Sequence, residues 1–220
     1  MLPSTSNLGD LTDRSKDLDK IALIDASDFD NPVELTHGDI DQRANAVARA
    51  LVAKGFQRGD RIAILAANSA DYLATYFGTM RAGMISVPVN WRFPKETVAY
   101  ILEDCDTKIV FTDTVRRGAV PDGLPIVEFG QDFVDFLDPG DFEIVECGQE
   151  EVAMFLYTSG STGRPKGVPL THHGHLWVIE MRSKGGGIEA HRLLVAAPLY
   201  HMNALAIAKA ALLGHATIVL

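Results

Sequence analysis

The sequence has few of the features that mark secreted, metal-bound or membrane-spanning chains. It holds two cysteines in 220 residues, with no CxxC pair and no histidine beside them at metal-ligand spacing. The N-terminus lacks the basic start and apolar core of a secretory signal. No apolar run approaches the about 20 residues that a membrane-spanning helix needs. We therefore expect a cytoplasmic protein with reduced thiols and no transmembrane segment.

An excess of positive charge is also missing. The chain has 20 lysines and arginines against 29 acidic residues, a formal net charge of -9. Nucleic acids are recruited by basic surfaces, so a nucleic-acid partner is not expected. Hydrophobic residues make up 47% of the chain, enough for a packed core. A phosphorylated ligand would have to be held by local amides, hydroxyls and a few cations.

Strands and helices are expected to alternate over residues 36–120. Thr36 stands three residues before Asp39, ahead of apolar positions at helical spacing, which is the pattern of a capped helix. Strands are expected at 61–66, 85–89 and 108–112, with a helix after each of the first two. This alternation predicts an α/β fold of mainly parallel sheets flanked by helices, with ligands at the carboxyl ends of the strands.

Four ranges follow from this pattern. We expect an N-terminal leader at 1–35, a first α/β lobe at 36–120, a connection at 121–148, and an incomplete second α/β lobe at 149–220. The connection is rich in proline, glycine and acidic residues, and we interpret its acidic residues as a solvated face rather than a metal site. In the last range we expect a strand at 152–157, a helix from Thr171 to about 184, a strand at 193–197, a helix at 202–213 and a strand at 216–220.

The segment YTSGSTGRPKGV at 157–168 carries the chemistry. Glycines let backbone amides approach an anion, hydroxyls donate hydrogen bonds without adding charge, and one lysine supplies a mobile cation. Such charge-assisted hydrogen bonds contribute roughly 1.5–3 kcal/mol each, so a few can hold a polyphosphate. The candidate phosphate-binding residues are Thr158, Ser159, Gly160, Ser161, Thr162, Gly163 and Lys166.

The better-known phosphate and nucleophile motifs do not fit this segment. In a Walker loop the lysine precedes serine or threonine, but Gly167 follows Lys166, and Pro165 and Pro169 argue against a helix beginning there. A hydrolase elbow needs glycine where Ser159 stands.

A dinucleotide fingerprint is formally present at Gly185, Gly187 and Ala190. It follows an expected helix and precedes an expected strand, the reverse of what that motif needs.

The run at 157–168 resembles the signature phosphate loop of the adenylate-forming, AMP-binding enzymes, of the acyl-CoA synthetase or fatty-acid–CoA ligase type. The resemblance continues through 55–90, 91–113 and 197–205 and covers most of residues 36–220. It implies the N-terminal lobes of that fold, truncated.

The resemblance implies that a carboxylic acid reacts with ATP and Mg²⁺ to give an acyl-adenylate, and that the acyl group then passes to coenzyme A. Fatty acids are the first choice of substrate; aromatic acids, as in an aryl-CoA ligase, and other adenylate-forming reactions are alternatives. The loop would hold the β- and γ-phosphates, with Thr158 near the magnesium ion and Lys166 partly ordering the loop. The implied acyl-pocket residues are His201, Met202, Asn203 and Ala204.

Several histidines and aromatic residues have more than one interpretation. His201 could instead close a strand and cap the next helix. His172, His173 and His175 are interpreted as a solvated helix start rather than a zinc site. Trp91 and Arg92, just after an expected strand, could border a ligand site, but packing is the preferred assignment.

Full-length members of the resembled family are more than twice this long. The resemblance places the adenine, ribose and hinge segments and the catalytic lysine outside these 220 residues, so no catalytic residue is assigned and no adenylation by this chain alone is expected. The alternative is a short protein that binds a nucleotide or a partner without catalysis. A homodimer is an open possibility.

Overall fold

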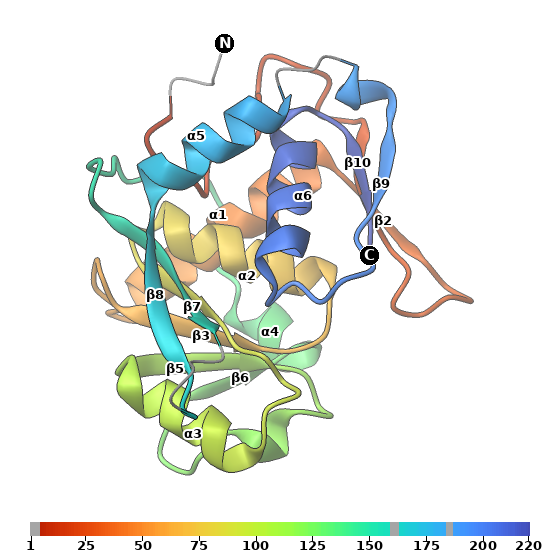
Figure 1. The fold of residues 1–220 in the computed structure, drawn as a ribbon. Coiled ribbons are helices and arrows are strands. Elements are labelled where there is room, and N and C mark those ends of the chain that lie inside the picture. The colour runs from red at the N-terminus through yellow and green to blue at the C-terminus, as the bar shows by residue number, and fades with distance from the viewer. Residues whose placement is uncertain (1–4, 159–162, 184–186) are drawn as a thin grey trace.

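The computed structural model describes residues 5–158, 163–183 and 187–220, and these form two sheets flanked by helices (Figure 1). The six-stranded sheet runs in the order β6 (Ile126–Glu128), β5 (Thr107–Thr112), β3 (Arg61–Leu65), β4 (Ile85–Pro88), β7 (Val152–Thr158) and β8 (Lys166–Thr171). The four-stranded sheet runs in the order β2 (Val33–Thr36), β1 (Ile21–Asp25), β10 (Thr217–Val219) and β9 (Arg192–Leu194). The helices are α1 (His37–Ala53), α2 (Ala70–Arg81), α3 (Lys95–Asp104), α4 (Gln131–Phe136), α5 (His172–Ser183) and α6 (Met202–Leu213).

Most neighbouring strands are parallel, as the alternating sequence pattern predicts. Only β8 in the large sheet and β2 in the small one pair antiparallel with a neighbour. The predicted cap of α1 is confirmed, because the Asp39 amide donates to the Thr36 hydroxyl at 3.0 Å and the Thr36 amide donates to the Asp39 carboxylate at 2.8 Å.

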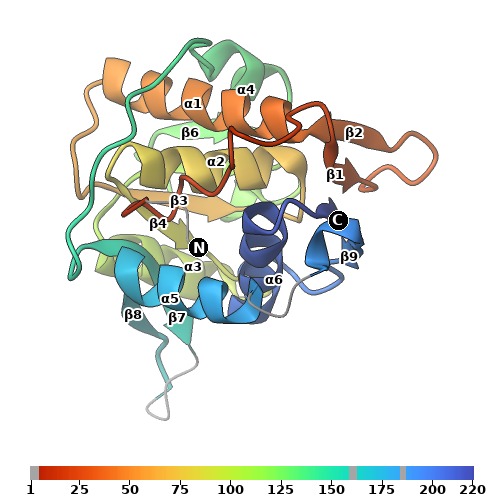
Figure 2. The ribbon, with the colours of Figure 1, turned by 90° about the horizontal axis from the view of Figure 1, so that it is seen from above.

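The large sheet is covered on both faces. Residues of α1, α2 and α4 pack on one face, whereas Val98, Ile101 and Leu102 of α3 pack on the other. Seen from above, α1 and α2 run side by side (Figure 2). A third apolar cluster joins the two sheets and contains residues of α2, α5, α6, β1, β7 and β10.

The segment expected as a leader differs from that expectation. It contributes β1 and most of β2, and Leu8 and Leu11 are almost fully buried in the cluster between the sheets. Its apolar residues come in pieces too short to show a period, separated by aspartate and lysine. The burial of Leu8 and Leu11 makes this segment part of the core.

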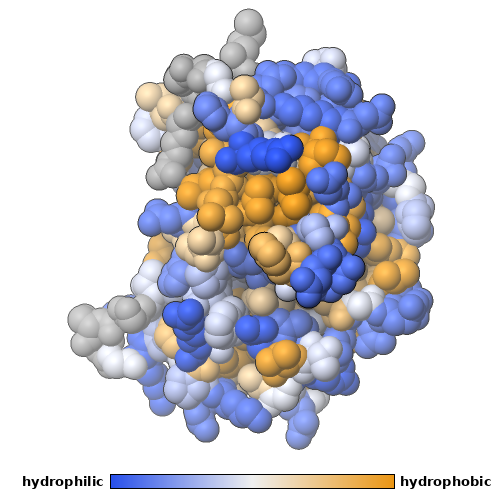
Figure 3. Space-filling view, turned by 90° about the vertical axis from the view of Figure 1, so that its right-hand side faces the viewer, coloured by the Kyte–Doolittle hydropathy of each residue, from blue (hydrophilic) through white to orange (hydrophobic). Residues whose placement is uncertain are grey.

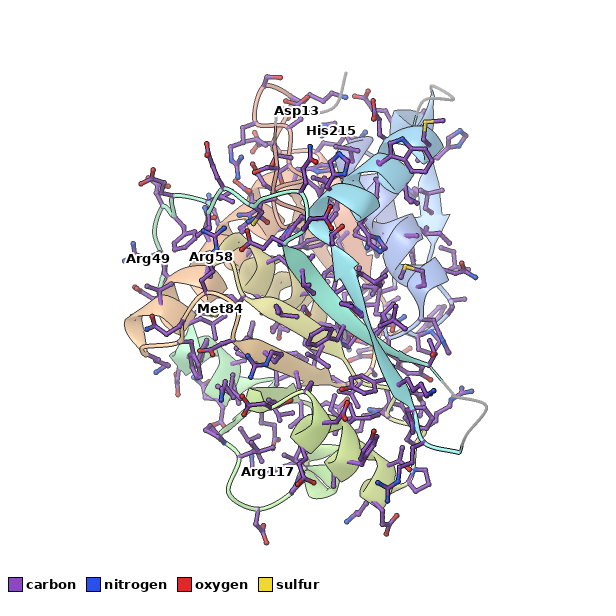
Figure 4. The ribbon with its side chains drawn as sticks, turned by 60° about the vertical axis from the view of Figure 1, so that its left-hand side comes forward. Asp13, Arg49, Arg58, Met84, Arg117 and His215 are labelled. Carbon is purple, nitrogen blue, oxygen red and sulfur yellow. The ribbon has the colours of Figure 1, made fainter. Side chains whose placement is uncertain are left out.

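The segment expected as a connection also contains regular structure. It includes edge strand β6 and helix α4, whose Phe133 and Phe136 are buried against Phe111 of β5. Arg49 of α1 pairs with the Asp138 carboxylate at 3.1 Å, and Arg58 donates to the Glu146 carbonyl at 2.9 Å. Both arginines lie beside this segment in Figure 4. Residues 121–148 are therefore held along one side of the large sheet.

Strand β8 was not expected, because the residues up to 168 were assigned to the glycine-rich loop. Pro169 lies inside β8; proline lacks an amide donor and is found in edge strands, and β8 is the edge strand beyond β7. Strands β7 and β8 therefore flank the glycine-rich segment as an antiparallel pair.

Candidate functional site

The base of the glycine-rich loop is formed by the facing ends of β7 and β8. Thr158 pairs directly with Lys166 in this antiparallel ladder, and both residues are exposed. Ser159, Gly160, Ser161 and Thr162, also predicted to bind phosphate, lie outside the described residues. The hairpin register places a hydroxyl and an ammonium side by side where the chain enters and leaves the loop.

Gly163 and Lys166 complete the described part of the loop. Gly163 has a φ of 89°, a conformation that favours glycine. No salt bridge in the described part of the chain involves Lys166. Its charge is therefore available to an anionic ligand.

The residues around His201 lie at the same edge of the large sheet as Thr158. Because β3, β4, β5 and β7 are parallel, their carboxyl ends share one edge. Asn68, just after β3, donates to the carbonyl of Ala197 at 3.0 Å and accepts from the amide of Leu199 at 2.7 Å. These bonds hold the segment that leads to His201 at the ligand-binding edge typical of parallel sheets.

A row of side chains continues from this edge to His201. The guanidinium carbon of Arg116 lies 4.1 Å from the Trp91 ring centroid, Trp91 meets Tyr200 edge-on at 6.0 Å, and the rings of Tyr200 and His201 are 4.5 Å apart. The indole nitrogen of Trp91 and the hydroxyl of Tyr200 are buried and have no hydrogen-bond partner among the described residues. A cleft of about 420 Å³ opens beside Asn68 and Trp91.

The four predicted acyl-pocket residues have different exposures. His201 and Asn203 are exposed, Met202 is half-buried, and Ala204 is fully buried in the cluster between the sheets. His201 occupies the N-cap position of α6, but its side chain makes no capping bond. Three apolar residues of α6, Met202, Ile207 and Leu213, are only partly buried, and an apolar area is visible on the face shown in Figure 3.

The interpretation of His172, His173 and His175 as a solvated helix start holds for the exposed His173 but is wrong for the other two histidines. His172 is fully buried and its Nδ1 accepts from the Leu8 amide at 2.9 Å, while His175 is 8% exposed. Burial lowers the pKa of His172 to about 4, so its ring is a neutral acceptor at pH 7. His172 thus attaches the N-terminal segment to α5, a contact that its position in the sequence could not indicate.

The described residues contain no cluster of three or more histidines, cysteines or carboxylates that could hold a metal ion. Magnesium usually keeps several waters and is bound together with substrate phosphates rather than in an all-protein cage. The exposed Thr158 hydroxyl would suit such an ion if a phosphate were bound beside it. In the same part of the chain, no helix has both the length and the apolar character that a membrane span requires.

Two residues of this edge, Asn68 and Tyr200, were missed as site residues by the sequence analysis. Asn68 lies shortly after β3 and directly before Ser69, the cap of α2, and polar residues at that place in an α/β fold are a usable signal. Trp91 lies shortly after β4 in the same way, and that position suggested a ligand site as the alternative to packing.

The chain is similar to known proteins in sequence and in fold. The family model described as AMP-binding enzyme matches residues 12–220. The long-chain-fatty-acid–CoA ligase FadD13 of Mycobacterium tuberculosis is 33% identical over 185 residues, which are 79% of this chain and 37% of that protein. A feruloyl-CoA synthase of Amycolatopsis is 34% identical over 177 residues, 78% of this chain and 35% of that protein.

Among solved structures, ATP-bound MatB from Rhodopseudomonas palustris matches with a TM-score of 0.84 at 28% identity. The match covers 98% of this chain and 45% of that one. The chain thus spans little more than a third of the two relatives and under half of this structure.

Proposed function

Because this chain belongs to the AMP-binding enzyme family, we propose that it supplies the phosphate-binding part of an ATP-dependent carboxylic acid–CoA ligase that acts on fatty acids. The observation that carries the proposal is the pairing of Thr158 with Lys166 at the base of the glycine-rich hairpin. The Lys166 ammonium would neutralise charge on the β- and γ-phosphates, and the Thr158 hydroxyl would donate to them. The magnesium ion that accompanies ATP would balance the remaining phosphate charge.

The residues near His201 would border the acid. The partly exposed apolar side chains of α6, the helix that His201 precedes, favour an acid with a hydrocarbon chain, and the similarity to FadD13 supports the same class. Aromatic acids are the second candidate, favoured by the similarity to feruloyl-CoA synthase and by the rings of Trp91 and Tyr200 beside His201. Two free, buried cysteines are consistent with a cytoplasmic location.

Replacing Lys166 with alanine is expected to weaken binding of inorganic tripolyphosphate by about tenfold or more, the size of one lost charge-assisted hydrogen bond. Stability should hardly change, since the side chain is exposed. Isothermal titration of this chain measures the affinity. Lys95→Ala, which also removes an exposed lysine, is the control. Equal tripolyphosphate affinities for Lys166→Ala and the control would show that Lys166 does not bind the phosphates.

This chain alone is expected to show no acid-dependent exchange between ATP and pyrophosphate. It covers 37% of FadD13 and 45% of MatB, and the family resemblance places the adenine and ribose contacts and the catalytic lysine in other segments. Exchange is measured with labelled pyrophosphate and a series of fatty and aromatic acids. A rate above background with any acid would show that these residues suffice for adenylation.

A further inference from the structure

The last turn of α3 contacts the glycine-rich hairpin on both sides of its loop. Tyr157, one residue before Thr158, donates its hydroxyl to the Asp104 carboxylate at 2.6 Å. Tyr100, one turn earlier on α3, donates to the other oxygen of Asp104 at 3.3 Å. On the far side of the loop, the guanidinium of Arg164 lies 5.2 Å from the centre of the Tyr100 ring. One helical turn therefore meets both the entry and the exit of the loop.

The Tyr157 ring also lies across the returning strand. Tyr157 pairs with Gly167 in the ladder, and a Cβ added to Gly167 would stand 2.9 Å from Cζ of the Tyr157 ring and 3.1 Å from its hydroxyl oxygen. Glycine at 167 therefore lets the ring cross β8 and reach Asp104. The hydroxyl contact with Asp104 thus fixes the ring where it crosses β8.

Asp104 does not stabilise α3, the helix that contains it. A carboxylate at the C-terminal end of a helix faces the negative end of the helix dipole, which costs about 0.3–1 kcal/mol at exposed sites. Asp104 is exposed, and no salt bridge of the described residues offsets its charge. Its hydrogen-bond partners are the hydroxyls of Tyr157 and Tyr100. Burial, and then the hydrogen bond to the Asp104 carboxylate, raise the pKa of Tyr157, so that hydroxyl stays a donor.

We infer that Asp104 and Tyr157 are positioning residues of the phosphate site: their hydrogen bond ties the hairpin to α3 and holds Thr158 and Lys166 at one place and spacing. This inference rests on the proposed function, because it assigns the tie to the same phosphate site. It predicts that the bond acts on ligand affinity through the hairpin, although neither side chain touches the phosphates.

The test uses this chain and inorganic tripolyphosphate as the probe. Tyr157→Phe and Asp104→Asn are each expected to weaken binding by about three- to tenfold, the range for one exposed hydrogen bond to a charged group. Tyr100→Phe is the matched control: it removes the same atom from the other tyrosine on Asp104, and its affinity should equal that of the parent chain. In the double variant Tyr157→Phe/Asp104→Asn the loss of tripolyphosphate affinity should not exceed the larger of the two single losses, because both substitutions act on the same hydrogen bond.

Amide hydrogen exchange and thermal unfolding separate positioning from general stability. The amides of Lys166 and Gly167 should exchange faster in Tyr157→Phe, with a midpoint of thermal unfolding like that of Tyr100→Phe. Tripolyphosphate affinities of Tyr157→Phe and Tyr100→Phe that match the parent would overturn the inference and leave the proposed function intact. Failure of the parent chain to bind tripolyphosphate would overturn both. Should Asp104→Asn fail to fold, the comparison of the two tyrosine variants decides.

Discussion

Replacing Lys209 with methionine is expected to stabilise the chain by about 2–4 kcal/mol at pH 7. Lys209 is fully buried in α6, and its Nζ lies 3.2 Å from Nδ1 of His175 and 3.3 Å from the Tyr76 hydroxyl. In the described part of the chain no carboxylate pairs with it. An ammonium buried without an anion is costly, whereas the methionine thioether fits an apolar cluster.

The size of the effect follows from the pKa. Burial lowers the pKa of Lys209 from 10.5 to about 7, which corresponds to a penalty on the order of 5 kcal/mol for the charged form. Methionine removes that penalty but also leaves Nδ1 of His175 without its partner, at a cost of about 1–3 kcal/mol. The two terms leave the net gain of about 2–4 kcal/mol.

The stability gained by Lys209→Met should decrease as the pH rises above 7. Between about pH 7 and 10.5 the unfolded chain keeps the proton on Lys209 while the folded chain releases it, so the free energy of unfolding rises with pH. The penalty is fully present below about pH 7 and vanishes above 10.5. The advantage of Lys209→Met should therefore shrink by about 1.4 kcal/mol for each pH unit above 7.

The free energy of unfolding of the parent and of Lys209→Met is measured with denaturant at pH 6, 7, 8 and 9. Steps of about one pH unit are fine enough to resolve this slope. Lys95→Met, which removes an exposed lysine, should follow the parent at every pH. Parallel stability curves for the parent and Lys209→Met would show that Lys209 does not titrate in this window.

Much of the first sheet could be predicted because its signals are local. The capping box of Thr36 and Asp39 and the short apolar runs fixed the class of each element, and β3, β4, β5 and α2 lie within a residue or two of the expected ranges. The hairpin could not be predicted in full: Pro169 argues against a strand locally, and only the edge position of β8 removes the conflict.

In the candidate site, too, the local features could be predicted from the sequence and the long-range contacts could not. The residue types at 157–168 suffice to indicate a phosphate loop, since the chemistry depends on glycine, hydroxyl and lysine in close order. The burial of His172 and the tie from Asp104 to Tyr157 depend on partners 164 and 53 residues away. Contacts of that range are set by the packing of helices on sheets, which local patterns do not determine.

Replacing Arg81 with methionine is expected to cost about 3–5 kcal/mol of stability, the range for breaking a buried ion pair by removing one partner. The Arg81 side chain is 2% exposed, and its Nη2 donates to the Asp41 carboxylate at 2.6 Å. It also donates to the Gly9 carbonyl at 2.8 Å and to the Asn45 side chain at 2.6 Å. Removing the guanidinium leaves these buried acceptors unpaired.

A second arginine on the same carboxylate provides the control. Arg14 binds Asp41 at 2.7 Å, but its side chain is 43% exposed, so Arg14→Met should cost about 1 kcal/mol or less. Denaturant unfolding compares the two variants. Arg81→Lys keeps the charge but loses the planar fork, and we expect it to recover only a small part of the loss. Equal costs for Arg81→Met and Arg14→Met would contradict the assignment of a buried network.

The Arg81 variant also tests whether residues 5–20 belong to the fold. The Gly9 carbonyl is held by Arg81, the Leu8 amide by His172, and Leu8 and Leu11 are buried between the sheets. If Arg81 anchors this segment to α2, limited proteolysis of Arg81→Met should cut at Arg14 or Lys16 well before the rest of the chain is digested. Strand β1 follows residues 5–20 directly and pairs with β10. Release of residues 5–20 should therefore also expose the apolar cluster between the two sheets. Uniform digestion of the variant and the parent would show that the segment is held by its apolar contacts alone.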